Sequence, residues 1–402
     1  MSFPRKVTIA AFLVPVMATV GTLALTDVAE GHAKATDVRV AAETEQFSLP
    51  ALIHIPHYPL TPVQPSSTPV RLSGTGKPLD VSYTYQGQRH TITDFLRRSS
   101  TLGFLVLHDD KVVDERYFQG QNADSRFNSW SVGKSITAAA IGVALNEGKI
   151  RSVDDPVTRY VPELKGTGYD GVPLIDVLHM ASGVKWDESN YFNFTTGATA
   201  AQLRLVLGTP LTDVAKESVS ERPPGTKWNY DSMDSFVLAW VLSKATGQSL
   251  ASYVQDKIWK PAGMKSTLYL GKDWAGNGLG YCCYHVTTRD LGRFGLLYLN
   301  QGKAQGKQVV PAGWVRDSTR VTVPINEPGQ INSAGWGYGS QWWVAPTPGD
   351  YTANGVFGQN VYVSPRDHVV IVKTSQDVLT YSSHFAELAT AFRAVADAVG
   401  GS

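Results

Sequence analysis

Two residues near position 130 have the types and spacing that nucleophilic catalysis requires. Ser131 and Lys134 lie three residues apart at the start of the segment SWSVGKSITAAAIGVALNEGKI, residues 129–150. On a helix they would share a face, and a serine in the first turn lies at the positive end of the helix dipole, where a developing negative charge is favoured. A lysine packed under the helix loses hydration, which lowers its pKa and makes a neutral amine available as a base. The pair therefore predicts acyl transfer, with Ser131 as nucleophile and Lys134 as its base.

Two ordinary explanations compete with this one. Serine is a common helix N-cap, and an S-x-x-K spacing arises about once by chance in a chain of this length. A second copy does exist, from Ser182 to Lys185. It is followed by polar and aromatic residues without helical spacing, which indicates a loop. Ser131 instead precedes apolar residues at helical spacing, and that helix is expected to end at Gly148. The context favours the first copy as the reactive pair.

Acyl transfer also needs a proton carrier and donors for the oxyanion. Tyr230 lies in a turn ahead of an apolar helix, with Ser232 two residues later. A phenol beside a lysine ammonium is expected to have a lowered pKa and to act as base and then as acid, although packing at a helix start would also explain this tyrosine. The stretch ANGVFGQNVYV, residues 353–363, places Gly355 and Gly358 at the start of a predicted strand. Small residues there let a substrate approach backbone N–H donors closely.

The order of these three elements resembles the motifs of serine β-lactamases, penicillin-binding proteins and related esterases. The flanking phrases NEGKIRSVDDPVTRYVPEL, LIDVLHMASGV, PPGTKWNYDS and TTRDLGRFGLLYL agree with that superfamily. Within it the chain is most similar to the aminohexanoate-dimer (nylon-oligomer) hydrolase branch, in GFLVLHDDKVV, SQWWV and GQNVYVSP, over about residues 100–400. The resemblance implies acylation of Ser131, with Lys134 and Tyr230 as proton carriers. The oxyanion would be held by the Ser131 N–H and by an N–H within Val356–Gln359.

Two departures from the family pattern bear on the substrate. Phe357 lies where a cationic or histidine side chain is usual in penicillin-recognising members, which argues against β-lactam or D-alanyl-D-alanine substrates. Ser232 ends the second motif where penicillin-binding proteins have asparagine, which fits the esterase and amide-hydrolase side. Tyr191 lies about where the nylon-oligomer hydrolases place a substrate-contacting tyrosine, with Trp186 as a second candidate, and packing would explain either. The full set of candidate oxyanion and substrate-binding residues is Val356, Phe357, Gly358, Gln359, Ser232, Tyr191 and Trp186.

The elements that must position these residues come from both ends of the chain. Residues 102–118 and 360–375 each have the pattern of a β-hairpin, and residues 383–399 have that of an amphipathic helix. Between them, over about 150–280, the pattern is mainly helical. The prediction is an α+β, β-lactamase-like fold in which one antiparallel sheet, built from both chain ends and flanked by helices, carries an inserted helical region.

The N-terminal part is expected to lie outside this domain. Two basic residues precede an apolar run over 7–25, and small residues follow, which is the pattern of a secretory signal or of an uncleaved membrane anchor. Residues 1–35 are assigned to this segment, so the protein is expected to be exported: periplasmic, secreted or tethered to a membrane. Residues 36–95 are rich in Pro, Ser and Thr and are predicted to be an extended arm. The hydrolase domain is then expected over 96–402.

Composition argues against several other classes. Lys and Arg total 36 and Asp and Glu total 35, so no basic excess predicts binding to nucleic acid. The nine histidines lack metal-ligand spacing, and no motif predicts a cofactor, because the glycine-rich SGTGKP lies in the proline-rich arm. The two cysteines, Cys282 and Cys283, are adjacent, and we expect them to be free thiols.

Three functions stay open at this point. The preferred one is a serine hydrolase that cleaves esters or small amides through an acyl-enzyme on Ser131. A penicillin-binding D,D-peptidase or a β-lactamase is the alternative, favoured if a cation from elsewhere fills the place of Phe357. A non-catalytic binding or sensor protein on the same fold is the third, against which the intact reactive residues argue. Fold and nucleophile do not name the substrate.

Overall fold

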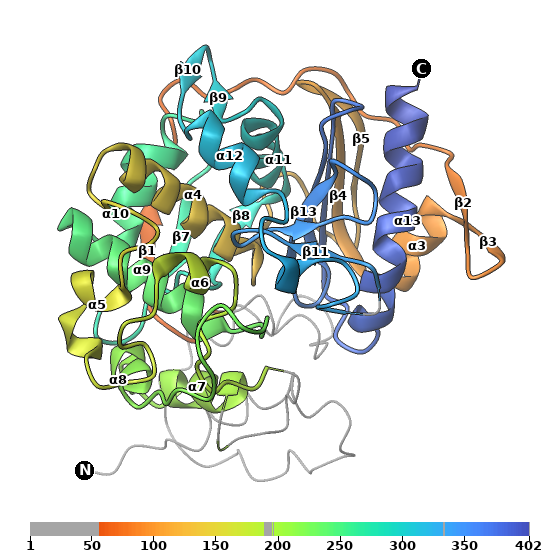
Figure 1. The fold of residues 1–402 in the computed structure, drawn as a ribbon. Coiled ribbons are helices and arrows are strands. Elements are labelled where there is room, and N and C mark those ends of the chain that lie inside the picture. Colours follow the sequence, from red (N-terminus) through yellow and green to blue (C-terminus); the bar gives the residue numbers. More distant parts are fainter. Residues whose placement is uncertain (1–55, 189–194, 196, 333, 402) are drawn as a thin grey trace, which may run out of the picture.

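A seven-stranded antiparallel sheet, in the order β11-β12-β13-β14-β15-β4-β5, forms the centre of the computed structural model. Strands from the N-terminal part, in orange, lie beside strands from the C-terminal part, in blue (Figure 1). Both predicted hairpins are confirmed, and the pairing of β15 with β4 joins them into one sheet. The structure describes residues 56–188, 195, 197–332 and 334–401. The strands of the sheet are β4 (Thr101–His108), β5 (Lys111–Tyr117), β11 (Gly337–Tyr338), β12 (Trp343–Val344), β13 (Tyr351–Gly355), β14 (Gln359–Ser364) and β15 (Val369–Ser375).

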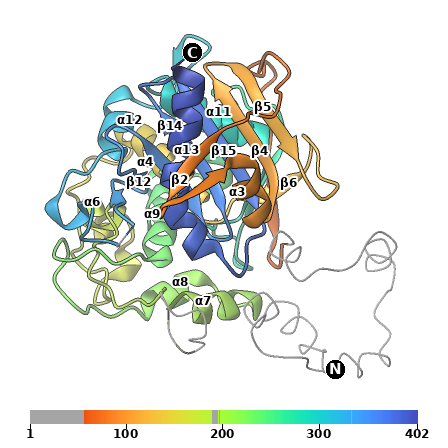
Figure 2. The ribbon, with the colours of Figure 1, turned by 90° about the vertical axis from the view of Figure 1, so that its right-hand side faces the viewer.

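The central strands are buried on both faces. Along β4, Phe104 and Val106 belong to one apolar cluster, whereas Leu105 and Leu107 belong to the other. This alternation follows from the two-residue repeat of a strand, and helices cover both faces, so the strands are apolar almost throughout. α3 (Ile92–Arg98) and α13 (Tyr381–Gly400) cover one face, as Figure 2 shows. α11 (Thr288–Leu299) packs on the other face.

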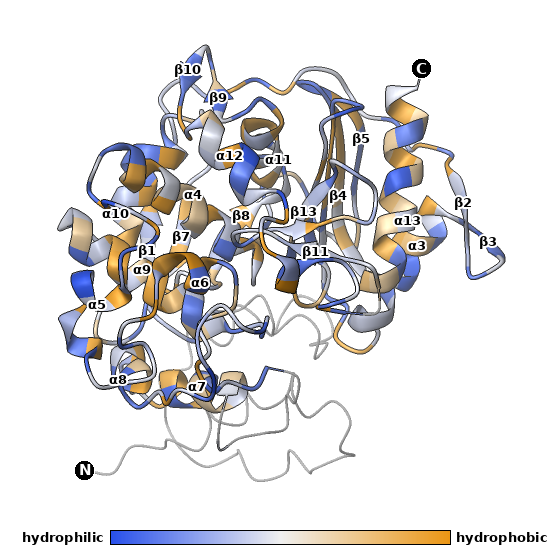
Figure 3. Ribbon diagram, in the orientation of Figure 1, coloured by the Kyte–Doolittle hydropathy of each residue, from blue (hydrophilic) through white to orange (hydrophobic). Residues whose placement is uncertain are grey.

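The last helix, α13, packs on the sheet through the apolar face that its sequence pattern predicted. The buried residues of α13 include Leu388, Phe392, Val395 and Val399, which recur at three- and four-residue spacing. Hydrophobic and hydrophilic colours alternate along this helix in Figure 3. The predicted amphipathic helix is confirmed, and its apolar face packs on the sheet.

Beyond α11 lies a mainly helical region around α4 (Val132–Asn146). Every residue of α4 from Val132 to Ala144 is buried, because the large sheet and α9 (Ser232–Thr246) pack against it. Tyr284, from a small four-stranded sheet, also contacts this helix, at Thr137. That small sheet has the order β1-β7-β8-β6. The remaining elements of this side are β1 (Leu60–Val63), β6 (Arg126–Asn128), α5 (Val157–Tyr160), α6 (Leu174–Leu178), α7 (Gly197–Val206), α8 (Leu211–Lys216), α10 (Leu250–Val254), β7 (Leu268–Gly271), β8 (Tyr284–Thr287) and α12 (Ala312–Ser318).

The segment expected to be an extended arm is packed where the structure describes it. β1 pairs with β7, and Val63 is fully buried in the main apolar cluster. β2 (Ser82–Tyr85) and β3 (Gln88–Thr91) form a hairpin beside α13. The expectation of an arm is therefore wrong over 56–95, because apolar residues between the prolines reach the core. The expected boundary at residue 96 falls inside α3.

The expected signal or anchor, residues 1–35, lies outside the described residues, as do residues 36–55. Within the part of the chain that the structure describes, no helix is both long and apolar enough to cross a bilayer.

Candidate active site

Ser131 and Lys134 meet at the beginning of α4. The Ser131 hydroxyl makes no capping bond to the helix backbone, and it lies 3.1 Å from the Lys134 Nζ. The lysine is 1% exposed, whereas the serine is only partly buried. The N-cap explanation of this serine therefore does not apply, and the geometry is that of a nucleophile in contact with a base.

The second S-x-x-K spacing has no such geometry. Ser182 and Lys185 lie in a loop after α6, as expected, and the Lys185 side chain is exposed. The Ser182 hydroxyl instead accepts a hydrogen bond from the Val184 N–H at 3.4 Å. These two residues are therefore not brought together as a reactive pair.

Three oxygen atoms surround the amine of Lys134. Its Nζ lies 2.8 Å from the Ser232 Oγ and 3.3 Å from the Tyr281 carbonyl oxygen, in addition to its contact with Ser131. Ser232 begins α9, and Tyr281 lies in the loop before β8. The amine is therefore held between three separate parts of the chain, and Ser232 is in the site that its motif predicted.

Burial changes the protonation of this amine. Loss of hydration lowers the pKa of Lys134 to about 8, although the charges of Glu188, Asp231 and Asp234 oppose that shift. At pH 7 about one molecule in ten would then carry the neutral amine. A lysine with this pKa can accept a proton near neutral pH.

Glu188 is a site residue that our sequence reasoning did not single out. Its Oε1 accepts a hydrogen bond from the Ser232 hydroxyl at 2.7 Å, and its Oε2 accepts one from the Ser232 N–H at 2.8 Å. The Trp186 indole donates to the same Oε2 at 2.9 Å. Trp186, expected as a substrate contact, thus orients Glu188. The sequence feature that could have indicated Glu188 is its position two residues after Trp186. Tyr191, the other candidate of this loop, lies outside the described residues.

Tyr230 lies beside the reactive pair, but with a different protonation from the one expected. Its ring centroid is 4.9 Å from the Lys134 Nζ, and Ser131 is close enough to the phenol to act on its pKa. Burial raises the pKa of Tyr230 well above its ordinary value, and the neighbouring Tyr338 and Glu188 raise it further. The expected lowering of this pKa is wrong, because aromatic rings surround the phenol. Tyr230 is therefore a protonated donor.

The end of β13 touches the beginning of α4. A Cβ built on Gly355, the last residue of β13, would lie 2.6 Å from the Ser129 carbonyl oxygen and 3.1 Å from the Ser131 nitrogen. Only a glycine permits this approach. Within the described part of the chain, neither the Ser131 N–H nor the Val356 N–H donates a hydrogen bond. Two uncommitted backbone donors therefore come from the nucleophile and from the turn beside it.

The other predicted residues of this turn have separate roles. Phe357 packs its ring edge-on against Trp130, with ring centroids 5.1 Å apart. The Gln359 side chain bonds both backbone groups of Ser375, donating to its carbonyl at 2.6 Å and accepting from its N–H at 3.1 Å. Gln359 therefore joins β14 to β15 and does not face a substrate through its amide. Gly358 packs against Lys373.

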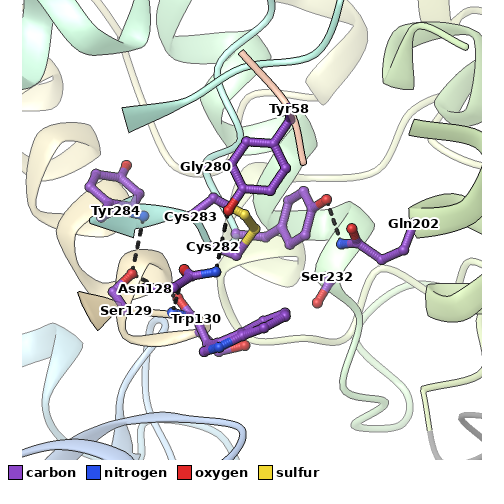
Figure 4. Close-up of a disulfide and its surroundings, with 12 residues drawn as sticks. Tyr58, Asn128, Ser129, Trp130, Gln202, Ser232, Gly280, Cys282, Cys283 and Tyr284 are labelled. Atoms are coloured by element: carbon purple, nitrogen blue, oxygen red, sulfur yellow. Dashed lines mark hydrogen bonds between the residues drawn. A yellow bond between two sulfur atoms is a disulfide. The ribbon is translucent and has the colours of Figure 1, made fainter. Parts of the chain in front are cut away.

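The two cysteines expected to be free thiols form a disulfide in the structure. The expectation was wrong because it assumed an ordinary backbone, whereas Cys283 adopts a φ of +72°. The disulfide is buried beneath the Tyr58 ring, and the Tyr58 hydroxyl accepts a hydrogen bond from the Asn128 amide (Figure 4). It directly follows Tyr281, whose carbonyl contacts Lys134. Because it joins adjacent residues, the disulfide restricts the backbone of Cys282 and Cys283, directly after this carbonyl.

Metal ligation was not expected from the sequence. Among the residues that the structure describes, no three His, Cys, Asp or Glu side chains are grouped so as to hold a metal ion.

Comparisons with known proteins bear on this geometry. The profile of the Beta-lactamase family matches residues 89–396. A 6-aminohexanoate-dimer hydrolase from Paenarthrobacter ureafaciens is 30% identical over 290 residues, which cover 70% of this chain and 74% of the relative. A solved structure from Bacillus anthracis, which carries the name of a 6-aminohexanoate-dimer hydrolase, is similar with a TM-score of 0.72 at 25% identity, over 85% of this chain and 92% of that one.

A more distant structure shares the fold alone. The octameric penicillin-binding protein homologue from Pyrococcus abyssi has a TM-score of 0.55 at 19% identity, over 74% of each chain. Together these matches confirm the predicted architecture and the resemblance carried by the three motifs.

Proposed function

The chain belongs to the β-lactamase family, and from this premise we propose that it cleaves esters or small amides through an acyl-enzyme on Ser131. The observation that carries the proposal is the contact of 3.1 Å between the Ser131 Oγ and the buried Nζ of Lys134. A nucleophile in contact with a base of suitable pKa is the arrangement that acyl transfer requires.

The hydrogen bonds around Lys134 support its role as base. A neutral amine has two N–H donors and one lone pair. The Tyr281 carbonyl accepts one N–H, and the Ser232 Oγ accepts the other, because the Ser232 proton is donated to Glu188. The lone pair is then left for the Ser131 hydroxyl. Glu188 and Ser232 would thus orient the base correctly.

The proposed reaction proceeds in two halves. The Ser131 Oγ attacks the substrate carbonyl carbon while its proton moves to the Lys134 Nζ, and the oxyanion is held by the Ser131 N–H and by Val356 N–H within the predicted Val356–Gln359 stretch. The leaving alkoxide or amine then departs with a proton delivered from Lys134 through the protonated phenol of Tyr230. In the second half, water attacks the acyl carbon while its proton moves to the Lys134 Nζ. The bond between the acyl carbon and the Ser131 Oγ then breaks, the carboxylic acid leaves, and the proton on Lys134 returns to the Ser131 Oγ.

The surroundings of the turn support an ester or small amide over a penicillin-type substrate. Phe357 brings an aromatic ring to the place where a cation would hold a carboxylate, and this ring packs against Trp130. The lysine next to the turn, Lys373, is 1% exposed and bonded to a backbone carbonyl. The relative from Paenarthrobacter ureafaciens is named for an amide substrate, and on this basis we include amides. We also propose export, from the N-terminal pattern of residues 1–35.

The test is the turnover of p-nitrophenyl butyrate by the wild-type chain and by two serine variants. We expect Ser131→Ala to lose at least about 10⁴-fold in kcat/KM, while Ser182→Ala, the serine of the second S-x-x-K, keeps measurable turnover. Incubation with a penicillin should leave no long-lived adduct in the intact-protein mass. A Ser131→Ala variant that turns over normally would refute the proposal. A stable penicillin adduct would move the protein to the penicillin-binding class.

A further inference from the structure

We infer that Lys373 is a positioning residue that fixes the oxyanion turn, residues 356–358, from behind. The inference rests on the proposed function, in which the Val356 N–H of this turn is the second oxyanion donor. Lys373 lies on β15, next to the strand β14 that follows the turn, and no sequence motif pointed to it.

The amine of Lys373 is bonded directly to the turn. Its Nζ donates to the Gly358 carbonyl oxygen at 3.2 Å, and the side chain is 1% exposed. Its other close neighbour is the Phe95 ring of α3, with the centroid 5.9 Å from the Nζ. The Lys373 side chain therefore lies on the α3 side of the sheet and anchors the turn from within the protein.

Gly358 is shaped to receive this amine. A Cβ at this position would lie 2.5 Å from the Lys373 Nζ and 3.1 Å from the Ser375 Oγ, and Gly358 has a φ of +90°. Any other residue would therefore be strained here and would also displace the amine. The Lys373 amine thus fills the space that a side chain at position 358 would need.

A second bond holds the preceding peptide of the same turn. The Asp377 backbone N–H donates to the Phe357 carbonyl oxygen at 3.1 Å. The Asp377 carboxylate in turn contacts the His384 Nδ1 at 2.5 Å, and its charge acts on Lys373. Both carbonyls at the far end of the turn are thus bonded from behind. The Val356 N–H is left without a partner among the described residues.

Burying the Lys373 amine costs free energy of hydration, so a need for packing alone does not explain a lysine at this position. Burial lowers the pKa of Lys373 to about 7, with the charge of Asp377 opposing the shift. An apolar side chain of similar length would avoid the loss of hydration. An amine donates hydrogen bonds in both protonation states, so its bond to Gly358 holds across neutral pH. A turn that is fixed before the reaction needs no reorganisation when the oxyanion forms.

The same burial means that Lys373 does not serve as the missing substrate cation. The penicillin-binding alternative requires a cation that reaches a substrate carboxylate. Lys373 instead contacts the Gly358 carbonyl and the Phe95 ring, and its side chain is inaccessible. Its role is to hold the backbone that contacts the substrate.

The test compares Lys373→Met with the wild-type chain. Methionine has a similar length and no donor, so it removes the bond to Gly358. With p-nitrophenyl butyrate we expect kcat to fall by about 10- to 100-fold, the effect of a small misplacement, while KM changes by less than about twofold. The inhibition constant of butylboronic acid, which forms a tetrahedral adduct at the serine, should rise by the same factor as kcat falls. The melting temperature should change little, because the lost bond to the Gly358 carbonyl and the relieved burial of the amine oppose each other.

The matched control is Thr374→Val, the next residue of β15. Thr374 is equally buried, bonds the Gly103 carbonyl and Thr288, and does not touch the turn. We expect its kcat and boronate affinity to stay near the wild-type values, whatever its melting temperature.

Three results would overturn the inference. The first is a Lys373→Met variant with wild-type kcat and boronate affinity. The second is an equal loss in Thr374→Val. The third is a loss that accompanies a large fall in melting temperature. If the Met variant does not fold, Lys373→Gln is compared, because a shorter donor that misses Gly358 should show the same parallel loss. If the wild-type chain itself shows neither turnover nor boronate binding, the proposed function fails instead.

Discussion

At the scale of single residues, the site depends on which hydrogen bonds Lys134 is allowed to make. Two of its neighbours, Ser232 and Tyr281, present oxygen lone pairs to the amine. Ser232 does so because its own proton is donated to Glu188. The Glu188 carboxylate therefore acts on Ser131 indirectly, through Ser232 and Lys134. This gives the charged residue beside the buried lysine a role in the proposed reaction.

The pH dependence of the reaction follows from the pKa of Lys134. In the mechanism that we propose, the reactive form is the neutral amine, and burial lowers the pKa of Lys134 to about 8. We therefore expect kcat/KM for p-nitrophenyl butyrate to rise with pH between about 6 and 8 and to level off above that range. Tyr230 stays protonated over this range, because burial raises the pKa of its phenol. A profile that is flat from pH 6 to 9 would contradict the assignment of Lys134 as base.

The Glu188→Gln variant should change this profile in a defined direction. The Glu188 charge raises the pKa of Lys134, so its removal should move the rise in kcat/KM to lower pH. The plateau should fall by about tenfold, because a hydrogen bond to a charged group is lost. The control is Glu147→Gln, where the same charge is removed from a carboxylate that bonds Lys257 and Tyr253 at the opposite end of α4. An equal shift in both variants would mean that Glu188 has no specific effect.

At the scale of elements, the site is the junction of one helix start and one strand end. α4 presents Ser131 at its first turn, and β13 ends against it at Gly355. The loop before β8 completes the junction with the Tyr281 carbonyl, and the disulfide between the adjacent Cys282 and Cys283 restricts the backbone that follows it. These elements are far apart in the chain. Their contacts therefore decide the geometry of the oxyanion donors.

Gly355→Ala should separate these two elements. The new Cβ would lie 2.6 Å from the Ser129 carbonyl oxygen, so β13 must move away from α4. We expect kcat to fall by about 100-fold, with labelling of Ser131 by a fluorophosphonate slowed in parallel. Gly313→Ala on α12 is the control, because a Cβ there meets only the Arg316 side chain at 3.6 Å. Activity retained in Gly355→Ala would show that the close approach is not needed.

At the scale of the whole molecule, both chain ends are needed to build the sheet that holds the site. β4 and β5 come from the N-terminal part, and β13 to β15 come from the C-terminal part. The helical region between them contributes Ser131 and Tyr230 on the other side of the site. Tyr230 and the end of β13 therefore reach the Ser131–Lys134 pair only when these distant segments pack together.

The sequence predicted correctly those features that depend on residues close together in the chain. The hairpins over residues 102–118 and 360–375 depend on neighbouring residues, and Ser131 and Lys134 meet within one turn of one helix. The contacts of Glu188 and Lys373 join residues distant in sequence, so no spacing could reveal them. The pKa of Tyr230 was predicted in the wrong direction for the same reason, because its aromatic surroundings come from other segments.

The central claim is that Ser131 is the nucleophile, and one measurement tests it directly. The purified chain is incubated with a fluorophosphonate, digested, and the modified peptide is sequenced by tandem mass spectrometry. We predict a single adduct on Ser131, formed faster as the pH rises toward about 8 because Lys134 loses its proton, and almost absent in Lys134→Met. An adduct on Ser182 or on Ser232, or no adduct in the folded protein, would contradict it.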